Sequence, residues 1–189
     1  MSSLRHIFSK SHYSSSPPQH SPPLPASSHW IPPPVGRLKI NVDAAWSVIN
    51  SYAGVGAVVR DANGVILASS FKRIPSAGGS LYAEATAFLF GIELAVALNI
   101  TSFILEGDAL IIVSDLNSNR TVLAPYGSCV DAALLLLQDC HCEIVHTSRS
   151  NNQLADSLAR HGMNCFDSVM LMGHVPHYCN IYAIADSSI

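Results

Sequence analysis

Four acidic side chains stand at positions where surface charges are unusual. The chain has 13 Asp and Glu residues among 189, and most of them fit exposed turns or helix faces. Asp43 lies inside an alternating apolar and polar run, where Asp is rare, and Asp108 ends the expected strand that contains the apolar run 103–105. Glu84 and Asp156 each lie in an Ala- and Leu-rich helical stretch. Taken singly, each has an ordinary explanation as a turn former or a solvated helix residue.

Together, the four carboxylates would make a metal site. Like charges at close range keep some of the groups protonated unless a cation lies between them. A ligand set made only of oxygens favours Mg²⁺ or Mn²⁺ over zinc. Two such ions form the arrangement for in-line displacement at phosphorus, in which one ion activates water and the other stabilises the leaving oxygen. The fold must therefore bring the four residues together.

The hydrophobic pattern predicts an α/β fold. Alternating runs indicate strands, the Asn-Gly turn at 61–64 indicates a hairpin, and a helical period begins after Ser80, which we expect to cap the helix. The expected strands cover about 38–44, 55–60, 65–71, 102–108 and 142–146, and the expected helices about 80–98, 109–116, 127–139 and 151–161. The order predicts a five-stranded mixed sheet, with three antiparallel strands followed by two parallel ones, flanked by helices.

This topology positions the four acids. The first strand should be central and the fourth should pair beside it, so that Asp43 and Asp108 become neighbours. The first long helix and the last helix would then bring Glu84 and Asp156 close to them.

The composition changes twice along the chain. Residues 1–35 hold 8 of the 11 prolines, 10 serines and no acidic residue, which predicts a disordered tail. Residues 36–165 form the expected domain, and residues 166–189 are apolar but aperiodic, with no confident structure. The acid-poor, Ser-rich start is also similar to an organelle transit peptide, although its prolines would break the amphipathic helix of such a peptide.

Net charge and apolar content argue against several classes of protein. The net charge of −3 disfavours a strongly basic nucleic-acid binder but leaves room for a weak or metal-assisted one. The apolar stretch 81–100 carries Glu84 and Glu93, so no membrane span is expected. Without an apolar signal segment, we expect an intracellular location, in the nucleus, the cytoplasm or an organelle. Five cysteines without paired spacing argue against a disulfide scaffold.

Other candidate sites are weaker. His141 lies between two cysteines, and His174, His177 and Cys179 cluster near the end of the chain. Neither group supplies two well-spaced pairs of zinc ligands. The glycines at 54 and 56 fall inside an expected strand and open no helix, so they do not form a phosphate-binding loop.

The residues from Trp30 to Asn164 resemble the type 1 ribonuclease H domain, in particular the plant reverse-transcriptase-like branch found in non-LTR retroelements and stand-alone host proteins. The resemblance rests on an ordered set of short motifs, each weak by itself. They are Trp30-x-x-Pro33-Pro34, Lys39-Ile40-Asn41-Val42-Asp43, Gly54-Val55-Gly56-Ala57-Val58-Val59-Arg60-Asp61-x-x-Gly64, Ala83-Glu84-Ala85-x-Ala87, Glu106-Gly107-Asp108 and His146-x-x-Arg149-x-x-Asn152-x-x-Ala155-Asp156-x-Leu158-Ala159-Arg160.

The resemblance implies an endonuclease that hydrolyses the RNA strand of RNA–DNA hybrids with two Mg²⁺ ions, which Mn²⁺ can replace. The family's metal ligands carry over as Asp43, Glu84, Asp108 and Asp156. His146, ten positions before the last aspartate, matches a mobile histidine expected to handle protons or release product. Asn152 matches a residue that helps to hold the nucleic-acid strand. For the last two residues, a purely structural role remains the alternative.

Departures from the family pattern favour a second function. Ala44 stands where the family often has glycine, and the region 116–130, where some relatives carry a basic grip, contains only Arg120. Residues 37–165 contain 8 Lys or Arg against 11 Asp or Glu, which predicts a modest, salt-sensitive affinity for the hybrid. The alternative is a catalytically weak or inactive nucleic-acid-binding domain derived from a retroelement. In either case we expect a monomer.

Overall fold

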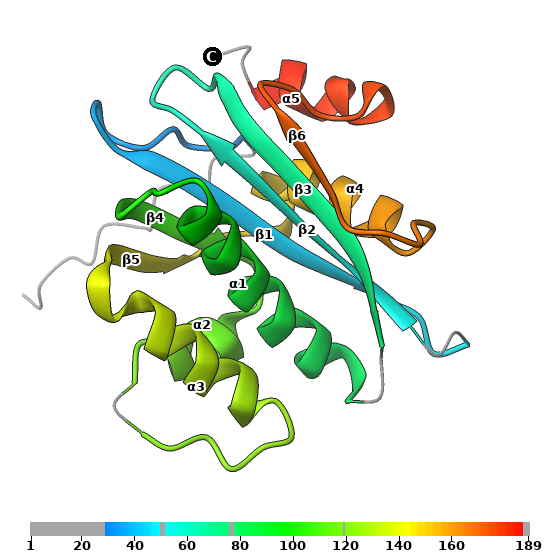
Figure 1. The fold of residues 1–189 in the computed structure, drawn as a ribbon. Helices are drawn as coiled ribbons and strands as arrows, with labels where there is room; N and C mark the ends of the chain where they lie inside the picture. Colours follow the sequence, from blue (N-terminus) through cyan, green and yellow to red (C-terminus); the bar gives the residue numbers. More distant parts are fainter. Residues whose placement is uncertain (1–28, 50–51, 76–77, 119, 187–189) are drawn as a thin grey trace, which may run out of the picture.

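A computed structural model describes residues 29–49, 52–75, 78–118 and 120–186. Its strands form one six-stranded sheet in the order β5-β4-β1-β2-β3-β6 (Figure 1). The strands are β1 Leu38–Trp46, β2 Tyr52–Arg60, β3 Ile66–Pro75, β4 Ser102–Gly107, β5 His141–His146 and β6 Val169–Met172. The α-helices are α1 Gly79–Ala97, α2 Leu110–Leu116, α3 Gly127–Leu136, α4 Gln153–Gly162 and α5 Asn180–Asp186. Three short 3₁₀ turns cover Leu137–Asp139, Arg149–Asn151 and His177–Cys179.

The strand pairing confirms the predicted mixed sheet. β1, β2 and β3 pair antiparallel, and β4 and β5 continue the sheet in parallel beside β1. The predicted turn is present: the Asp61 carboxylate accepts bonds from the N–H groups of Asn63 and Val65, and Gly64 has a φ of +76°. The number of strands differs from the prediction, because β6 adds a sixth strand to the edge of β3.

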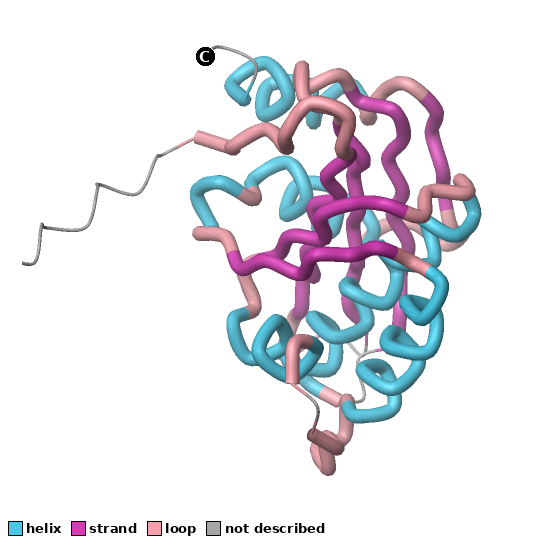
Figure 2. The backbone as a smooth tube through the Cα atoms, turned by 90° about the vertical axis from the view of Figure 1, so that its left-hand side faces the viewer, coloured by secondary structure: helices cyan, strands magenta, loops and turns pink. Residues whose placement is uncertain are grey.

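Helices cover both faces of the sheet (Figures 1 and 2). Successive side chains of β1 point alternately toward one face and the other. Ile40 and Val42 point toward α1, where Gly91 lets the helix approach them. Asp43 pairs with Gly56, which lies against α4, so Asp43 is on the α4 side of the sheet. Because side chains alternate between faces, Asn41 shares the side of Asp43.

Helix α1 is the central helix of the core. By length and composition it could cross a membrane, but half of it is buried within this fold. Its small residues Ala83, Ala87 and Gly91 are among those that pack inside. The helix begins at Gly79 with Gly78 as its N-cap, so Ser80, predicted as the cap, lies inside the first turn instead.

Two glycines on β2 determine how closely α4 approaches the sheet. A Cβ atom at Gly54 or Gly56 would collide with the backbone of Ala159, and one at Gly56 also with the backbone of Ala155. The glycines noted in the sequence therefore serve helix–sheet packing. This close contact brings the start of α4, with Asp156, toward Asp43 on the neighbouring strand.

Both ends of the described chain extend the predicted domain. Trp30, inside the tail expected for residues 1–35, is buried at 1% exposure, and the Arg60 guanidinium lies 3.7 Å above its ring. At the other end, Asp186 accepts a 2.6 Å bond from Arg60. Residues 29–35, predicted as part of the disordered tail, therefore belong to the described domain. Residues 1–28 lie outside the described part. The segment after 165 forms β6 and α5 because its apolar residues pack as a second core cluster.

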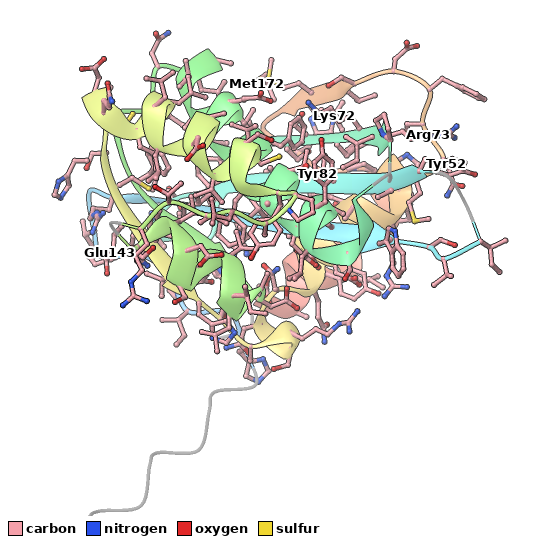
Figure 3. All side chains as sticks on the ribbon, turned by 90° about the horizontal axis from the view of Figure 1, so that it is seen from below. Tyr52, Lys72, Arg73, Tyr82, Glu143 and Met172 are labelled. Atoms are coloured by element: carbon pink, nitrogen blue, oxygen red, sulfur yellow. The ribbon has the colours of Figure 1, made fainter. Side chains whose placement is uncertain are left out.

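Arg73 connects the start of this C-terminal segment to the end of the β2–β3 pair at which Tyr52 lies. Its guanidinium lies 4.2 Å from the ring centre of Tyr52, and the two side chains are neighbours in Figure 3. The same group lies 4.9 Å from the ring centre of Phe166, and its Nε donates to the carbonyl of Met163. The chain that leaves α4 is therefore fixed before β6 begins.

Candidate metal centre

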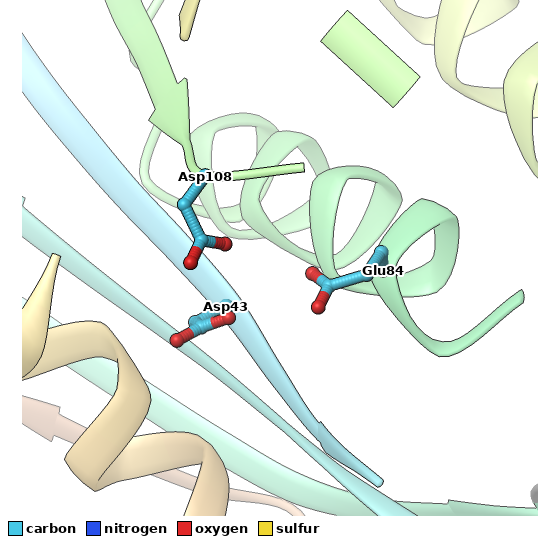
Figure 4. Close-up of side chains that lie close together, drawn as sticks. All are labelled: Asp43, Glu84 and Asp108. Carbon is cyan, nitrogen blue, oxygen red and sulfur yellow. The ribbon is translucent and has the colours of Figure 1, made fainter. Parts of the chain in front are cut away.

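Three of the four predicted carboxylates converge. Asp43 comes from β1, Glu84 from α1 and Asp108 from the position directly after β4 (Figure 4). One carboxylate oxygen from each of the three lies within 4.8 Å of the other two. The expectation that strand pairing and the first long helix bring these residues together is confirmed.

The end of one strand makes this meeting possible. The pairing of β1 with β4 ends at Asn41 and Glu106. At Asp43, the edge of β1 that faces β4 therefore has no paired strand, although the other edge still pairs with β2. A side chain from α1, on the opposite face, can reach Asp43 through this opening. Gly107 contributes because it lets the Phe88 ring lie against β4, one turn after Glu84.

Burial and mutual repulsion make these carboxyl groups hard to ionise. Burial, followed by the charges of Glu84, Asp108 and Asp156, raises the pKa of Asp43 to about 9. Burial is also the main cause that raises the pKa of Glu84 to about 8. The Ala44 N–H donates to Oδ1 of Asp43 at 2.8 Å and opposes both shifts. Such a partly buried cluster, made only of carboxylate oxygen ligands, fits a hard divalent cation.

Asp156 lies beside this cluster but outside it. Its charge contributes to the raised pKa of Asp43, which places it near the three acids. Its own oxygens face arginines: Arg160 Nε donates to Oδ2 at 2.8 Å, and Arg149 Nη2 lies 4.0 Å from Oδ1. The structure thus has Asp156 in an arginine-bound position.

His146 is the last residue of β5 and pairs in register with Gly107, the residue before Asp108. Its side chain is exposed and borders a pocket of about 400 Å³, whose polar lining includes Ser148 and Asn151. A charge on His146 lowers the pKa of Asp108, against the larger effect of burial. The histidine is therefore next to the cluster and open to solvent, and its predicted role stays a prediction.

Asn152 has a buried position at the start of α4. Its side chain is 1% exposed, its Nδ2 donates to the Val42 carbonyl at 2.8 Å, and its Oδ1 accepts from Asn41 at 3.3 Å. These bonds join α4 to β1 next to Asp43. A direct contact with a nucleic-acid strand, the predicted role, would require these bonds to open.

The bonds of Asn152 belong to a buried polar network under the metal centre. The Asn41 amide donates to Glu106 at 2.9 Å, and Glu106 also accepts a 2.6 Å bond from Lys39. The Asn41 carbonyl oxygen accepts from Trp30 and Arg60. Asn41 and Glu106 stand two residues before Asp43 and Asp108, so the network fixes both strands that supply two of the clustered carboxylates.

Arg149 belongs to the last motif of the sequence, although no part in the site is predicted for it. Its positive charge lowers the pKa of Glu84 and of Asp108, so it acts directly on the cluster. Tyr182 of α5 was also missed, and it borders the same region beside Asp156. The place of Arg149 in the last motif is a sequence signal that could have assigned it to the site. The C-terminal segment has no periodic pattern, so the sequence contains no comparable signal for Tyr182.

The family model described as reverse transcriptase-like matches residues 41–162, which contain all four acids, His146 and Asn152. The chain belongs to this family. A curated relative from Arabidopsis thaliana, whose name describes it as an inferred ribonuclease H protein, is 30% identical over 147 residues. That match covers 74% of this chain but 24% of the relative, so this chain spans about a quarter of the relative's length.

Solved structures place this reverse transcriptase-like chain in the type 1 ribonuclease H fold. The RNase H1 of the archaeon Halobacterium salinarum is 26% identical with a TM-score of 0.62, over 68% of this chain and 98% of that one. The N-terminal RNase H domain of a Mycobacterium tuberculosis protein is 25% identical with a TM-score of 0.61, over 68% and 94%. A third RNase H1, solved in complex with an RNA/DNA hybrid, is 21% identical with a TM-score of 0.59, over 68% and 97%.

Proposed function

We propose that this chain is a divalent-metal-dependent endonuclease that hydrolyses the RNA strand of RNA–DNA hybrids. The observation that carries the proposal is the convergence of three carboxylates from β1, α1 and the end of β4, of which Asp43 is buried and the other two are half-buried. In a member of this family with the ribonuclease H fold, such a cluster suits a metal-assisted displacement at phosphorus.

Each residue would have a defined part in that reaction. Asp43, on the central strand, would be the main Mg²⁺ ligand, and Glu84 and Asp108 would contribute further carboxylate ligands from the flanking elements. The bound ions supply an activated water and neutralise the leaving oxygen. Asp156 would complete the ligand set after leaving Arg160. His146 would exchange a proton with the product at the edge of the site.

The substrate would be recognised mainly by shape. Enzymes that select an RNA strand within a duplex contact its 2′-hydroxyl groups and backbone across the minor groove. The described domain is poor in basic residues, so electrostatic attraction contributes little and affinity is modest. The metal ions would offset part of the repulsion between the acidic cluster and the phosphates.

A cleavage assay on a labelled RNA–DNA hybrid tests the proposal. We expect cutting of the RNA strand with Mg²⁺ or Mn²⁺, and none with Ca²⁺ or excess chelator, because the larger Ca²⁺ shell misplaces the attacking water. Double-stranded DNA of the same sequence serves as the uncut control. Equal turnover in Ca²⁺ or in chelator would contradict the metal mechanism.

The second candidate is a domain that binds hybrid with little turnover. The arginine contact of Asp156 and the Ala44 methyl beside Asp43 favour it, because both alter the surroundings of the metal ligands. Measurable hybrid binding without cleavage in Mg²⁺ or Mn²⁺ would support this candidate over the nuclease.

A further inference from the structure

A groove of about 390 Å³ lies beside Asp156, on the α4 side of the molecule. It is formed by side chains from two distant parts of the chain, the start of α4 and the C-terminal helix α5. Its lining residues are Arg149, Ser150, Gln153, Asp156 and Tyr182. All of them except Asp156 carry side-chain hydrogen-bond donors, and Arg149 is 76% exposed.

Tyr182 is fixed in this groove by contacts on both sides of it. Cys179, Tyr182 and Asp186 are spaced three and four residues apart, so they lie on one face of the helical segment. Cys179 Sγ lies 3.2 Å from the Ser157 hydroxyl of α4, and Asp186 accepts the 2.6 Å bond from Arg60. The Tyr182 ring is half-buried against the second core cluster. The phenol is therefore held in place before any ligand arrives.

The groove offers an anionic strand one cation, the exposed Arg149, while the Asp156 carboxylate that also lines it is bound by Arg160 and lies 4.0 Å from Arg149. Arg149 acts both on the groove it lines and on the carboxylates of the metal centre, since its charge lowers the pKa of Glu84 and Asp108. The groove is thus next to the metal centre and has donors arranged along it. A chain of phosphates and sugars that passes the metal centre would meet these donors.

We propose that Tyr182, together with Arg149, Ser150 and Gln153, binds the sugar–phosphate backbone of the nucleic-acid strand beside the metal centre. The Tyr182 hydroxyl donates to a phosphate oxygen, and the Arg149 guanidinium pairs with the same backbone. This inference rests on the proposed function and extends it, because the family match ends at residue 162, before β6 and α5. The C-terminal segment then acts as a positioning element as well as a cover for the sheet.

The test measures binding of a fluorescent RNA–DNA hybrid to the full chain in chelator, where no cleavage occurs. Tyr182→Phe keeps the ring and removes the hydroxyl, and we expect hybrid affinity to fall about 3- to 10-fold, the size of one typical net hydrogen bond at a site open to water. Arg149→Ala should weaken binding at least as much and reduce the salt slope by about one. Ile181→Ala, on the same helix and 64% exposed, is the matched control and should bind like the parent.

Thermal unfolding of each variant separates binding from folding. Unchanged affinity in Tyr182→Phe, with the same melting temperature as the parent, would overturn the proposal. So would an equal loss of affinity in Ile181→Ala, or a parent chain that binds no hybrid at all. A parent that binds hybrid but does not cut it would refute the nuclease activity alone, and the affinities of the variants would still decide the role of Tyr182.

Discussion

Asp43 is the residue on which the proposed metal centre should depend most. It lies on the central strand and is 4% exposed, and the charges of three other acids act on it. His146 has the opposite character, because it is exposed and lies at the end of the outer strand β5. Replacing either residue should therefore affect cleavage and Mg²⁺ affinity in different ways.

Asp43→Asn keeps the shape of the side chain and removes its charge. We expect hybrid cleavage to fall at least about 100-fold, because a preorganised electrostatic element is lost, together with most of the Mg²⁺ affinity. His146→Ala should slow turnover about 10- to 100-fold and leave Mg²⁺ affinity nearly unchanged. Calorimetric Mg²⁺ titration and cleavage rates check both. A His146→Ala protein that loses metal as fully as Asp43→Asn would refute the division of roles.

The raised pKa values predict how pH acts on the metal-free protein. Asp43 and Glu84 have pKa values of about 9 and 8 when folded, above their values in the unfolded chain. The folded state therefore binds more protons, so its stability is highest in acid and falls as pH rises toward 9. Melting in chelator should show this decline between pH 6 and 9, and Asp43→Asn should flatten it.

Added Mg²⁺ should reverse the trend, because the ion binds the deprotonated carboxylates. The rise in melting temperature on adding Mg²⁺ should grow from pH 6 to pH 8. A rise that is independent of pH would contradict the assignment of these acids as the ligands.

At the residue scale, the sequence predicted the cluster well. Asp43 falls inside a predicted strand and Asp108 at the end of one, and such positions can be read from the sequence without coordinates. The contact of Asp156 with Arg160 was not predicted, because a helical spacing of four residues is compatible with both an ion pair and a metal ligand. The choice depends on the side-chain position, which the pattern does not contain.

At the scale of elements, the position of α4 depends on the two glycines of β2. The helix backbone lies where a β-carbon of Gly56 would stand, and this atom would meet the N of Ala159 and the O of Ala155. On the opposite face, Gly91 of α1 makes a different contact, because a β-carbon there would meet the side chains of Val42 and Leu105.

This difference predicts unequal costs for the same substitution. Gly56→Ala should lower the free energy of unfolding by about 3 kcal/mol or more, because backbone atoms cannot move aside. Gly91→Ala should cost about 1 to 2 kcal/mol, because side chains can change rotamer. Urea denaturation of both variants provides the comparison. Equal costs would show that α4 shifts freely over the sheet.

The strands and helices themselves were largely predictable from the period of the hydrophobic residues. Strands and helices up to residue 162 follow clear alternating or helical patterns, and the structure confirms their order. β6 was missed because Val169–Met172 is apolar throughout, so it shows no alternation, and its pairing with β3 depends on a partner far away in the sequence. α5 is only seven residues long and gave no helical period to detect.

At the scale of the molecule, Arg60 joins the two ends of the described chain. Its guanidinium stacks on Trp30 near the start and binds Asp186 near the end, and its side chain is 2% exposed. It also donates to Asn41, the centre of the polar network under the metal site. Burial of this charge is tolerated because Asp186 neutralises it.

Asp186→Asn should therefore be costly. We expect a loss of about 3 kcal/mol in the free energy of unfolding, because a buried guanidinium loses its counter-charge. Glu143→Gln is the matched control, since it breaks the ion pair with Arg37 at the surface, where Glu143 is 58% exposed, and should cost less than about 1 kcal/mol. Urea denaturation measures both. A control that costs as much as Asp186→Asn would mean that the Arg60 pair contributes no more than a surface pair.

The position of Asp186 also has a consequence for synthesis on the ribosome. Translation releases β1, β2 and Arg60 long before α5, and a domain begins to fold as it emerges. Until Asp186 leaves the exit tunnel, a nascent chain that buries Arg60 carries a guanidinium without its carboxylate partner. The domain can therefore be completed only after residue 186 has left the ribosome, and a chain truncated shortly before this position would be suited to capture by chaperones.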